Sequence, residues 1–323
     1  MYISIWNQCN LSCSHCFNHE GKTTFGVLGR EEIVSLIRKS KTYFQIDTVQ
    51  LSGGEPTQRP DLDNILSTLL ADGYRIRLQT NLMLTDEMKR TLLAYSGEHL
   101  ELIVSHDGIE THDIIRGKGS SEEVSNNLEL LSRYFKIRVN TLLTSMIQWH
   151  EIESIAELAL RFNLTLAFNP LCPCGRAGKE ILMPRNQYFD WMFRLEKLRE
   201  QGISVRKGFD IENGRLIESE NCPVRKAEAI NIAADGSVYP CGFLSGHTFC
   251  RMGSAGHSIF ETHFVNLKNN PCVELPQQCK ECDYYSNRFC HGGCPARIYS
   301  LFGTWDMPDI YCMAEYYNDN HRV

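Results

Sequence analysis

Apolar and polar positions alternate over short stretches of the first 205 residues, separated by longer stretches with apolar residues at helical spacing. Alternation with a period of two is typical of β-strands, and apolar residues three or four positions apart are typical of amphipathic helices. The predicted strands are residues 2–6, 48–52, 75–79, 101–105, 136–143 and 165–169. The predicted helices are residues 30–44, 61–72, 85–95, 121–135, 151–163 and 185–201. Six alternating pairs predict an α/β fold, a partial (β/α)6 barrel of the TIM type, with its ligand site at the carboxyl ends of the strands.

Two of the predicted helices begin with residues that cap helices well. Thr85 precedes two acidic residues, and Ser120 precedes Glu122 and Glu123. A hydroxyl at the cap position accepts a hydrogen bond from a free N–H of the first turn, so both residues are predicted N-caps.

The region after about residue 205 has weaker periodicity and more cysteine. A segment that cannot build a large apolar core can be held together by metal instead, so we expect two domains, residues 1–205 and 206–323. Within the second, residues 230–234 and 237–239 flank Asp235-Gly236. This dipeptide predicts a β-hairpin with a two-residue turn, which would hold Cys241 in a fixed place.

Composition narrows the possible compartments and partners. The net charge is −6 and no block of basic residues appears, which argues against nucleic-acid binding. The N-terminus has no signal-peptide pattern and no run is apolar enough to cross a bilayer, so we expect a cytoplasmic protein without a membrane partner. Disulfides are one interpretation of the 14 cysteines. In a reducing compartment, clustered cysteines more often hold metal.

Three of the cysteines stand close together after the first predicted strand. Cys9, Cys13 and Cys16 have the spacing C-x3-C-x2-C. Three thiolates so placed can wrap one face of an iron–sulfur cubane and leave the fourth iron open to bind and activate a ligand. Zinc is the alternative, with His15 as a fourth ligand in awkward geometry.

This loop resembles the hallmark of the radical S-adenosylmethionine (SAM) enzymes, in which an aromatic residue, here Phe17, follows the last cysteine. The resemblance implies that Cys9, Cys13 and Cys16 hold a [4Fe–4S] cluster. It also implies that the amino and carboxylate groups of SAM chelate the open iron.

Motifs at the ends of the next strands extend the resemblance. Residues 52–56 are similar to the family's GGEP motif, which contacts the SAM amino group, although the same residues also suit a generic strand-to-helix turn. Residues 79–81 resemble a stretch near the ribose, with Leu82 in place of the usual Gly. The resemblance implies that Ser105 and Arg116 approach the SAM carboxylate. The alternative is that Arg116 is only a solvent-exposed arginine in a turn. The expected cofactor-binding residues are Ser52, Gly53, Gly54, Glu55, Pro56, Thr80, Asn81, Ser105, Asp107, Arg116 and Asn140.

Seven further cysteines resemble the SPASM extension of a subset of radical SAM enzymes, which carries two more [4Fe–4S] clusters. Mapped by order, the resemblance assigns one auxiliary cluster to Cys222, Cys241 and Cys294. It assigns the other to Cys279, Cys282, Cys290 and Cys312. A zinc ribbon on Cys279, Cys282, Cys290 and Cys294 is the alternative, but it leaves three cysteines unexplained.

The first auxiliary set has only three cysteines, so its fourth position is open. Substrate or water would fill it, or one of four side chains, Cys250, Cys272, Glu218 or Glu220.

Two more cysteines follow the sixth predicted strand. Cys172 and Cys174 lie in the stretch 171–177, at the mouth of the predicted barrel. One hypothesis makes them catalytic, as hydrogen-atom donors to a substrate radical. The alternative is that they are small buried core residues.

The resemblance implies an enzyme that binds SAM and three [4Fe–4S] clusters and receives electrons from a flavodoxin- or ferredoxin-type reductant. SAM is then cleaved to a 5′-deoxyadenosyl radical, which abstracts hydrogen from the substrate. The expected substrate is a ribosomally made peptide, to be crosslinked, epimerised or oxidised. Alternatives are a small molecule (a sugar, nucleoside or amino acid) and a non-catalytic iron–sulfur or zinc scaffold.

Two departures from the family pattern refine the peptide hypothesis. The chain begins on its first predicted strand, so we expect no N-terminal recognition domain, and a separate peptide-recognition protein or direct docking would be needed. Gly242 follows Cys241 where sulfatase-maturing relatives carry an Asp base, which disfavours formylglycine formation.

Overall fold

Seven parallel strands follow one another in chain order in the computed structural model, which describes residues 1–18, 26–212, 215–218, 222–226, 229–255 and 267–320. They are β1 (Tyr2–Trp6), β2 (Thr48–Gly53), β3 (Arg75–Thr80), β4 (Leu100–Ser105), β5 (Lys136–Leu143), β6 (Thr165–Pro170) and β7 (Ser204–Lys207). All six predicted strands are confirmed, with ends that differ by one residue at most. Strand β7, which pairs with β6, was not predicted.

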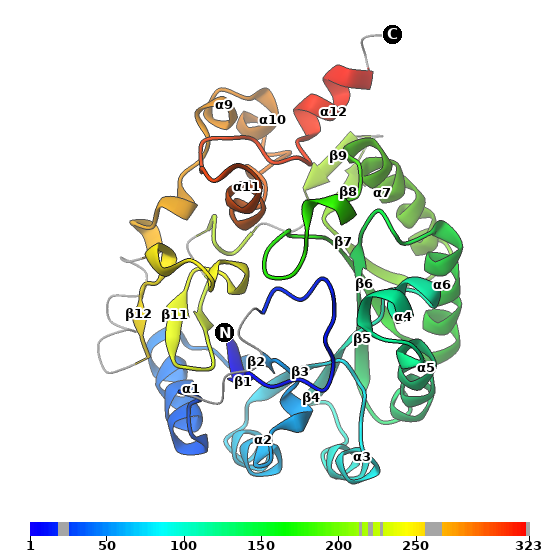
Figure 1. Cartoon of the computed structure of the whole chain (residues 1–323), viewed down its shortest axis with the longest axis vertical. Helices are drawn as coiled ribbons and strands as arrows, with labels where there is room; N and C mark the ends of the chain where they lie inside the picture. The colour runs from blue at the N-terminus through cyan, green and yellow to red at the C-terminus, as the bar shows by residue number, and fades with distance from the viewer. Residues whose placement is uncertain (19–25, 213–214, 219–221, 227–228, 256–266, 321–323) are drawn as a thin grey trace.

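Helices cover the outside of this curved sheet (Figure 1). They are α1 (Arg30–Phe44), α2 (Leu62–Ala71), α3 (Asp86–Leu93), α4 (Glu110–Arg116), α5 (Ser120–Leu131), α6 (Trp149–Phe162) and α7 (Arg185–Glu200), with the 3-10 turns η1 (Pro56–Gln58) and η2 (Lys179–Ile181). The six predicted helices are confirmed, and α4 was not predicted. The Thr85 cap is confirmed, because its side chain accepts a hydrogen bond from the Met88 N–H. The Ser120 cap is wrong: Gly119 is the N-cap, and the Asp113 carboxylate accepts from the N–H groups of Gly119 and Ser121.

Alternation along the strands separates two faces of the sheet. One face is apolar and buried beneath the helices, and its residues include Ile3, Ile5, Val49, Leu51, Ile76, Leu78, Leu102, Val104, Ile137 and Val139. The other face lines a cavity inside the curve of the sheet, and its residues include Tyr2, Gln50, Ser52, Gln79, Ser105, Asn140 and Leu142. Parallel strands buried on both faces are usually continuously apolar. The alternation seen here therefore reflects a polar interior that can receive a ligand.

The cysteine-rich segment, residues 206–323, extends the same sheet. Strands β10 (Asn231–Ile232), β11 (Ser237–Tyr239) and β12 (Gly253–Ser254) give the described part of the chain a ten-stranded sheet in the order β12-β11-β10-β1-β2-β3-β4-β5-β6-β7. The predicted hairpin is confirmed, since β10 and β11 are antiparallel and Gly236 in the turn has φ +81°. Strand β10, the inner strand of this hairpin, pairs in parallel with β1. The sheet thus crosses the predicted boundary after residue 205, and the division into two domains stays a prediction.

The remaining elements of the cysteine-rich segment are short. They are β8 (Phe209–Glu212), β9 (Arg215–Glu218), η3 (Gly242–Leu244), η4 (Thr248–Cys250), η5 (Pro271–Val273), α9 (Gln277–Lys280), α10 (Asp283–Ser286), α11 (Pro295–Phe302) and α12 (Met313–Asn320). Aromatic packing fixes this segment to the barrel: Tyr311 stacks on Tyr188 of α7 with ring centroids 4.1 Å apart, and its hydroxyl donates to the Met183 carbonyl at 2.9 Å. Among the described residues, no helix is long and apolar enough to cross a membrane.

Candidate active site

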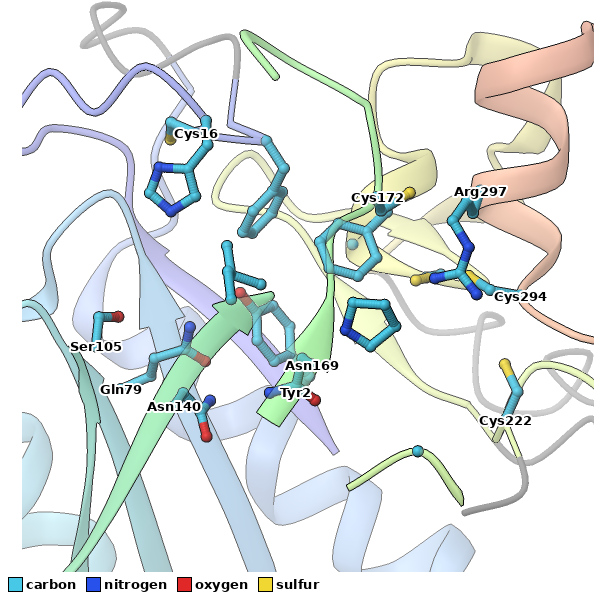
Figure 2. A pocket seen from close by; sticks show the side chains of 18 of the residues that line it. Tyr2, Cys16, Gln79, Ser105, Asn140, Asn169, Cys172, Cys222, Cys294 and Arg297 are labelled. Atoms are coloured by element: carbon cyan, nitrogen blue, oxygen red, sulfur yellow. The ribbon is translucent and has the colours of Figure 1, made fainter. Parts of the chain in front are cut away.

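A cavity of about 570 Å³ lies where the barrel strands end and the cysteine-rich segment meets them. The inward residues of β1 to β6 form one wall, and cysteines from both parts of the chain form the other (Figure 2). This volume falls within the range of about 300–1,000 Å³ typical of ligand sites. Gln79 and Asn169, which the sequence analysis did not select as site residues, also face it.

The cysteine loop after β1 forms part of this wall. Cys9, Cys13 and Cys16 all line the cavity, and their thiols are electrostatically coupled. Asn81 at the end of β3 donates a hydrogen bond to the Cys9 sulfur at 3.7 Å and another to the Asn10 side chain at 2.8 Å. Burial raises the pKa of Cys9 to about 11. A buried thiolate needs a countercharge, which a bound metal supplies.

Gly53 and Gly54 let the end of β2 lie directly against this loop. A Cβ on Gly53 would be 2.0 Å from the Trp6 carbonyl oxygen, and one on Gly54 would be 2.2 Å from the Gln8 carbonyl oxygen. The Gly54 N–H donates to the Trp6 carbonyl at 2.7 Å. The glycines are therefore required for backbone packing that holds the cysteine loop, in addition to any contact with a ligand.

Glu55 joins the ends of β2 and β3. It is 1% exposed, and its carboxylate accepts hydrogen bonds from Thr57 N–H and hydroxyl, from the Thr80 hydroxyl and from the Asn81 N–H at 2.7–3.1 Å. Burial raises the pKa of this carboxyl, against the effect of the hydrogen bonds. Glu55 thus positions Thr80 and Asn81 at the edge of the cavity.

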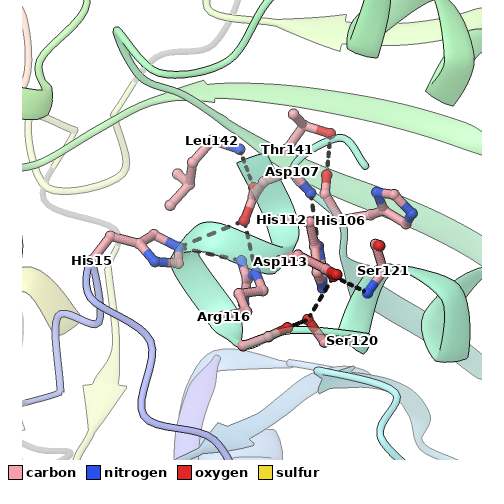
Figure 3. Close-up of polar contacts among 11 residues, drawn as sticks. His15, His106, Asp107, His112, Asp113, Arg116, Ser120, Ser121, Thr141 and Leu142 are labelled. Atoms are coloured by element: carbon pink, nitrogen blue, oxygen red, sulfur yellow. Dashed lines mark hydrogen bonds and ion pairs between the residues drawn. The ribbon is translucent and has the colours of Figure 1, made fainter. Parts of the chain in front are cut away.

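A buried ionic network stands behind the cysteine loop (Figure 3). Arg116 donates from Nε to Asp107 Oδ2 at 2.7 Å, and the Leu142 N–H donates to Asp107 Oδ1 at 2.9 Å. His15 Nε2 lies 3.3 Å from Arg116 Nη2 and 3.8 Å from Asp107 Oδ2. Burial would raise the pKa of Asp107, but Arg116, the two nearby histidines and the Leu142 N–H together outweigh it and hold the pKa well below its usual range. Burial, with Arg116 adding to it, lowers the pKa of His15 to about 4.

Most predicted cofactor-binding residues face the cavity, but two do not line it. Ser52, Gly53, Gly54, Glu55, Thr80, Asn81, Ser105, Arg116 and Asn140 line it. Pro56 instead begins η1, and Asp107 is completely buried beneath Arg116. Asp107 and His15 therefore affect the site indirectly, by positioning the Arg116 side chain. No spacing pattern predicts the contact between Arg116 and His15, because the two residues are 101 positions apart.

Thiols of the second set lie close enough to interact electrostatically. Cys294 is electrostatically coupled to Cys222 and to Cys241. Cys279 is coupled to Cys282 and Cys312, and Cys290 to Cys279 and Cys312. The assignment of these seven cysteines to two auxiliary clusters or to a zinc ribbon stays a prediction. Among the described residues, Cys282 is the one predicted ligand that does not line the cavity.

The other four cysteines occupy different surroundings. Cys172 lines the cavity and is 5% exposed. Cys174 is half-buried, while Cys250 and Cys272 are completely buried, and none of these three lines the cavity. All 14 cysteines of the chain are free thiols.

The donor set fits iron–sulfur clusters better than single ions. Within the described ranges, no group of three or more His, Cys, Asp and Glu side chains has the geometry to hold one metal ion. Ten cysteines nevertheless line one cavity. A cubane binds each thiolate through a different iron atom and so suits thiols that are spread more widely than the ligands of zinc.

Comparison with known proteins agrees with this site. Residues 3–159 match the family described as the Radical SAM superfamily. The chain is 28% identical to mycofactocin maturase MftC of Mycobacterium tuberculosis (94% of this chain, 80% of that protein) and 28% identical to an AdoMet-dependent heme synthase of Methanosarcina barkeri (94% and 93%). Its fold is similar to that of Streptococcus suis SuiB bound to the precursor peptide SuiA, with a TM-score of 0.75, 14% identity, and coverage of 97% of this chain and 75% of that one.

The matched region contains most of β1, the strands β2 to β5, the cysteine loop and the cavity-lining residues of this part of the barrel. Family membership implies SAM and an iron–sulfur cluster as cofactors, and the thiols of Cys9, Cys13 and Cys16 are suited to hold that cluster. The chain belongs to the radical SAM superfamily and is a radical SAM enzyme.

Proposed function

We propose that this enzyme modifies a ribosomally made peptide and that it uses SAM and three [4Fe–4S] clusters. The observation that carries the proposal is one shared cavity, lined both by the cysteine loop of the barrel and by cysteines of the second set. Phe17 of the loop packs edge-on against Phe243 of η3 with ring centroids 5.1 Å apart, so the two cysteine regions are in direct contact. In this proposal residues 1–205 are the radical SAM barrel and residues 206–323 a SPASM domain.

Each cluster has its own set of ligands. Cys9, Cys13 and Cys16 hold the first and leave one iron for SAM. The auxiliary clusters take the two coupled groups, Cys222, Cys241 and Cys294 for one and Cys279, Cys282, Cys290 and Cys312 for the other. When bound, the first cluster and SAM supply a radical that removes hydrogen from the substrate.

The chain's own side chains bind and orient the cofactor. Arg116 presents its guanidinium to the SAM carboxylate, because Asp107 fixes it from behind through Nε. Ser105 and Asn140, paired across β4 and β5, offer polar groups beside it. The cysteine-rich segment covers the strand ends and excludes water from the cavity, which protects a reactive radical.

Two relatives support a peptide substrate. MftC is named a maturase, and SuiB was solved with a precursor peptide bound. An external reductant of the flavodoxin or ferredoxin type supplies the electron, and a separate recognition protein is the expected means of presenting the peptide.

A small-molecule substrate is the second candidate. The heme synthase relative is as similar in sequence as MftC, and GTP 3′,8-cyclases also match, at 24–25% identity. The same cavity would then hold the small molecule in place of a peptide side chain.

Anaerobic reconstitution followed by product analysis tests the proposal. We expect about twelve irons per chain, the number in three cubanes, and release of 5′-deoxyadenosine only with reductant. Cys13→Ala should abolish 5′-deoxyadenosine release. About four irons would contradict the auxiliary clusters. A mass change in a short peptide encoded beside the gene supports peptide modification, and turnover of a small molecule with no change in any such peptide refutes it.

A further inference from the structure

Cys172 has a position that neither the radical-forming site nor the auxiliary assignments use. It follows β6, on the barrel side of the cavity, and its side chain lines the cavity together with those of Cys222, Cys241 and Cys294. Figure 2 shows Cys172 on the same side of the cavity as Cys294 and Arg297. In the proposed ligand sets, the cluster held by Cys222, Cys241 and Cys294 has no fourth protein ligand.

The Cys172 thiol lies within interaction range of the thiols of Cys174 and Cys294. Cys172 also belongs to a buried cluster against which Cys222, Cys241 and Cys294 pack. The positive charge of the Arg297 guanidinium interacts electrostatically with the thiols of both Cys172 and Cys294. The guanidinium is fixed by two hydrogen bonds that it donates to Asp309, at 2.6 and 2.7 Å.

The other candidates for the fourth position fit less well. Cys250 and Cys272 are completely buried and do not line the cavity. Cys272 does lie within interaction range of Cys222 and Cys241, so it is tested beside Cys172 below. Glu218 lines the cavity, but its carboxylate accepts a hydrogen bond from the His291 N–H at 2.6 Å. The same carboxylate interacts electrostatically with Cys290, a proposed ligand of the other cluster. Glu220 lies outside the described residues.

The loop that carries Cys172 is also fixed to the first cysteine loop. The Arg176 N–H donates to the Cys16 carbonyl at 2.8 Å. Gly175 has φ +69°, and a Cβ there would be 2.3 Å from the same carbonyl oxygen. One short loop therefore touches Cys16 at one end and Cys294 at the other.

We propose that Cys172 is the fourth ligand of the auxiliary cluster held by Cys222, Cys241 and Cys294. The assignment rests on the proposed function, since it requires that auxiliary cluster. An Fe–S bond forms as the Cys172 thiol gives its proton to solvent, and no electron is transferred in this step. All four irons then have protein ligands, so substrate cannot bind this cluster directly. A thiolate bound to iron has no S–H hydrogen, so the assignment replaces the hypothesis that Cys172 donates hydrogen to a substrate radical.

The test uses the full chain with the first cluster removed. The background variant carries Cys9→Ala, Cys13→Ala and Cys16→Ala, which leaves the auxiliary clusters as the only iron. We expect about eight irons per chain and, after reduction, no coupling to added [13C]cyanide in the cluster's paramagnetic resonance spectrum. Iron close to zero would refute the auxiliary clusters and with them the proposed function. Eight irons with cyanide already bound would overturn the Cys172 assignment alone, because an open iron would then exist.

Further substitutions in this background identify the ligand. Cys172→Ala should open one iron, so that one cyanide binds per chain, whereas Cys174→Ala and Cys272→Ala should leave the cluster closed. Cyanide binding in Cys272→Ala instead, or none in Cys172→Ala with unchanged spectra, would overturn the proposal. Cys172→Ser serves if the alanine variant does not fold. Its oxygen can still ligate, so we expect eight irons with a shifted reduction potential, and an unchanged potential and spectrum would also overturn the proposal.

Discussion

Substitution of Asp107 tests the buried network behind the cysteine loop. Asp107→Asn keeps the size of the side chain and an oxygen for the Leu142 N–H, but removes the charge opposite Arg116. Both members of the pair are buried, with side chains 0% and 9% exposed. The variant therefore leaves a buried guanidinium without a counter-ion, and we expect lower stability and weaker SAM binding.

The magnitude follows from the burial and the distance. At 2.7 Å between Arg116 Nε and Asp107 Oδ2, an effective dielectric constant of about 20 gives an attraction of roughly 6 kcal/mol before desolvation. Removal of one partner of a buried pair typically costs about 3–5 kcal/mol. For a chain of 323 residues, the unfolding entropy is roughly 0.7 kcal/mol per degree, so we expect the Tm to fall by about 4–7 °C.

Thermal unfolding of the reconstituted protein, with SAM affinity measured by calorimetry, checks this expectation. The matched control is Asp72→Asn, which breaks an Arg–Asp pair of similar geometry between Arg38 and Asp72 on the surface. Solvent screens an exposed pair, so the control should change Tm and SAM affinity very little. Bound iron should be unchanged in both variants, since neither residue is a proposed ligand. Equal Tm values for the two variants, or unchanged SAM affinity in Asp107→Asn, would refute the reasoning.

Three further predictions concern backbone packing, pH and metal. Gly54→Ala should reduce the amount of bound iron, because the new Cβ would be 2.2 Å from the Gln8 carbonyl oxygen. The control Gly73→Ala should retain its iron, because a Cβ there meets nothing within 4 Å. Equal iron content in the two variants would contradict this prediction. Burial lowers the pKa of His106 to about 4 and of His112 to about 3. In the unfolded state both histidines have a pKa of about 6.5, so the unfolded state binds more protons as the pH falls through that value. Each residue should therefore lower the free energy of unfolding by roughly 1 kcal/mol between pH 7.5 and pH 5.5. Urea unfolding across that range measures the loss, and His112→Gln should reduce it; an identical pH dependence in this variant would count against the argument. Chelation of iron should make the cysteine-rich segment more sensitive to protease than the barrel, and equal rates of cleavage in both parts would show that metal does not support that segment.

Local patterns predicted most of the barrel because they depend on neighbouring residues. Apolar alternation placed β1 to β6 within one residue at each end, and helical spacing placed the six longer helices. The seven-residue helix α4 was missed, since its residues were interpreted as part of a motif loop. Strand β7 has four residues and presents too short a pattern to be recognised. The Ser120 cap was wrong because Asp113, on another helix, satisfies the N–H groups that a cap would satisfy.

The candidate site was predicted in part for the same reason. Strand-end residues such as Ser105 and Asn140 follow directly from the alternation, and both line the cavity. Asp107 was expected at the cofactor, but its carboxylate lies beneath Arg116, and sequence spacing does not say toward which side of a strand end a side chain turns. His15 was considered only as a zinc ligand, whereas its Nε2 faces Arg116.

The sequence by itself determined the α/β alternation, the hairpin at Asp235-Gly236, the family and the order of the cysteines, because each of these depends on spacing along the chain. Only the tertiary structure decided which distant residues meet. It placed β10 beside β1, Gly54 against Gln8, and Cys172 against Cys294. Such contacts depend on the curvature of the sheet and on how loops from separate strands pack at one edge, and no local periodicity records them.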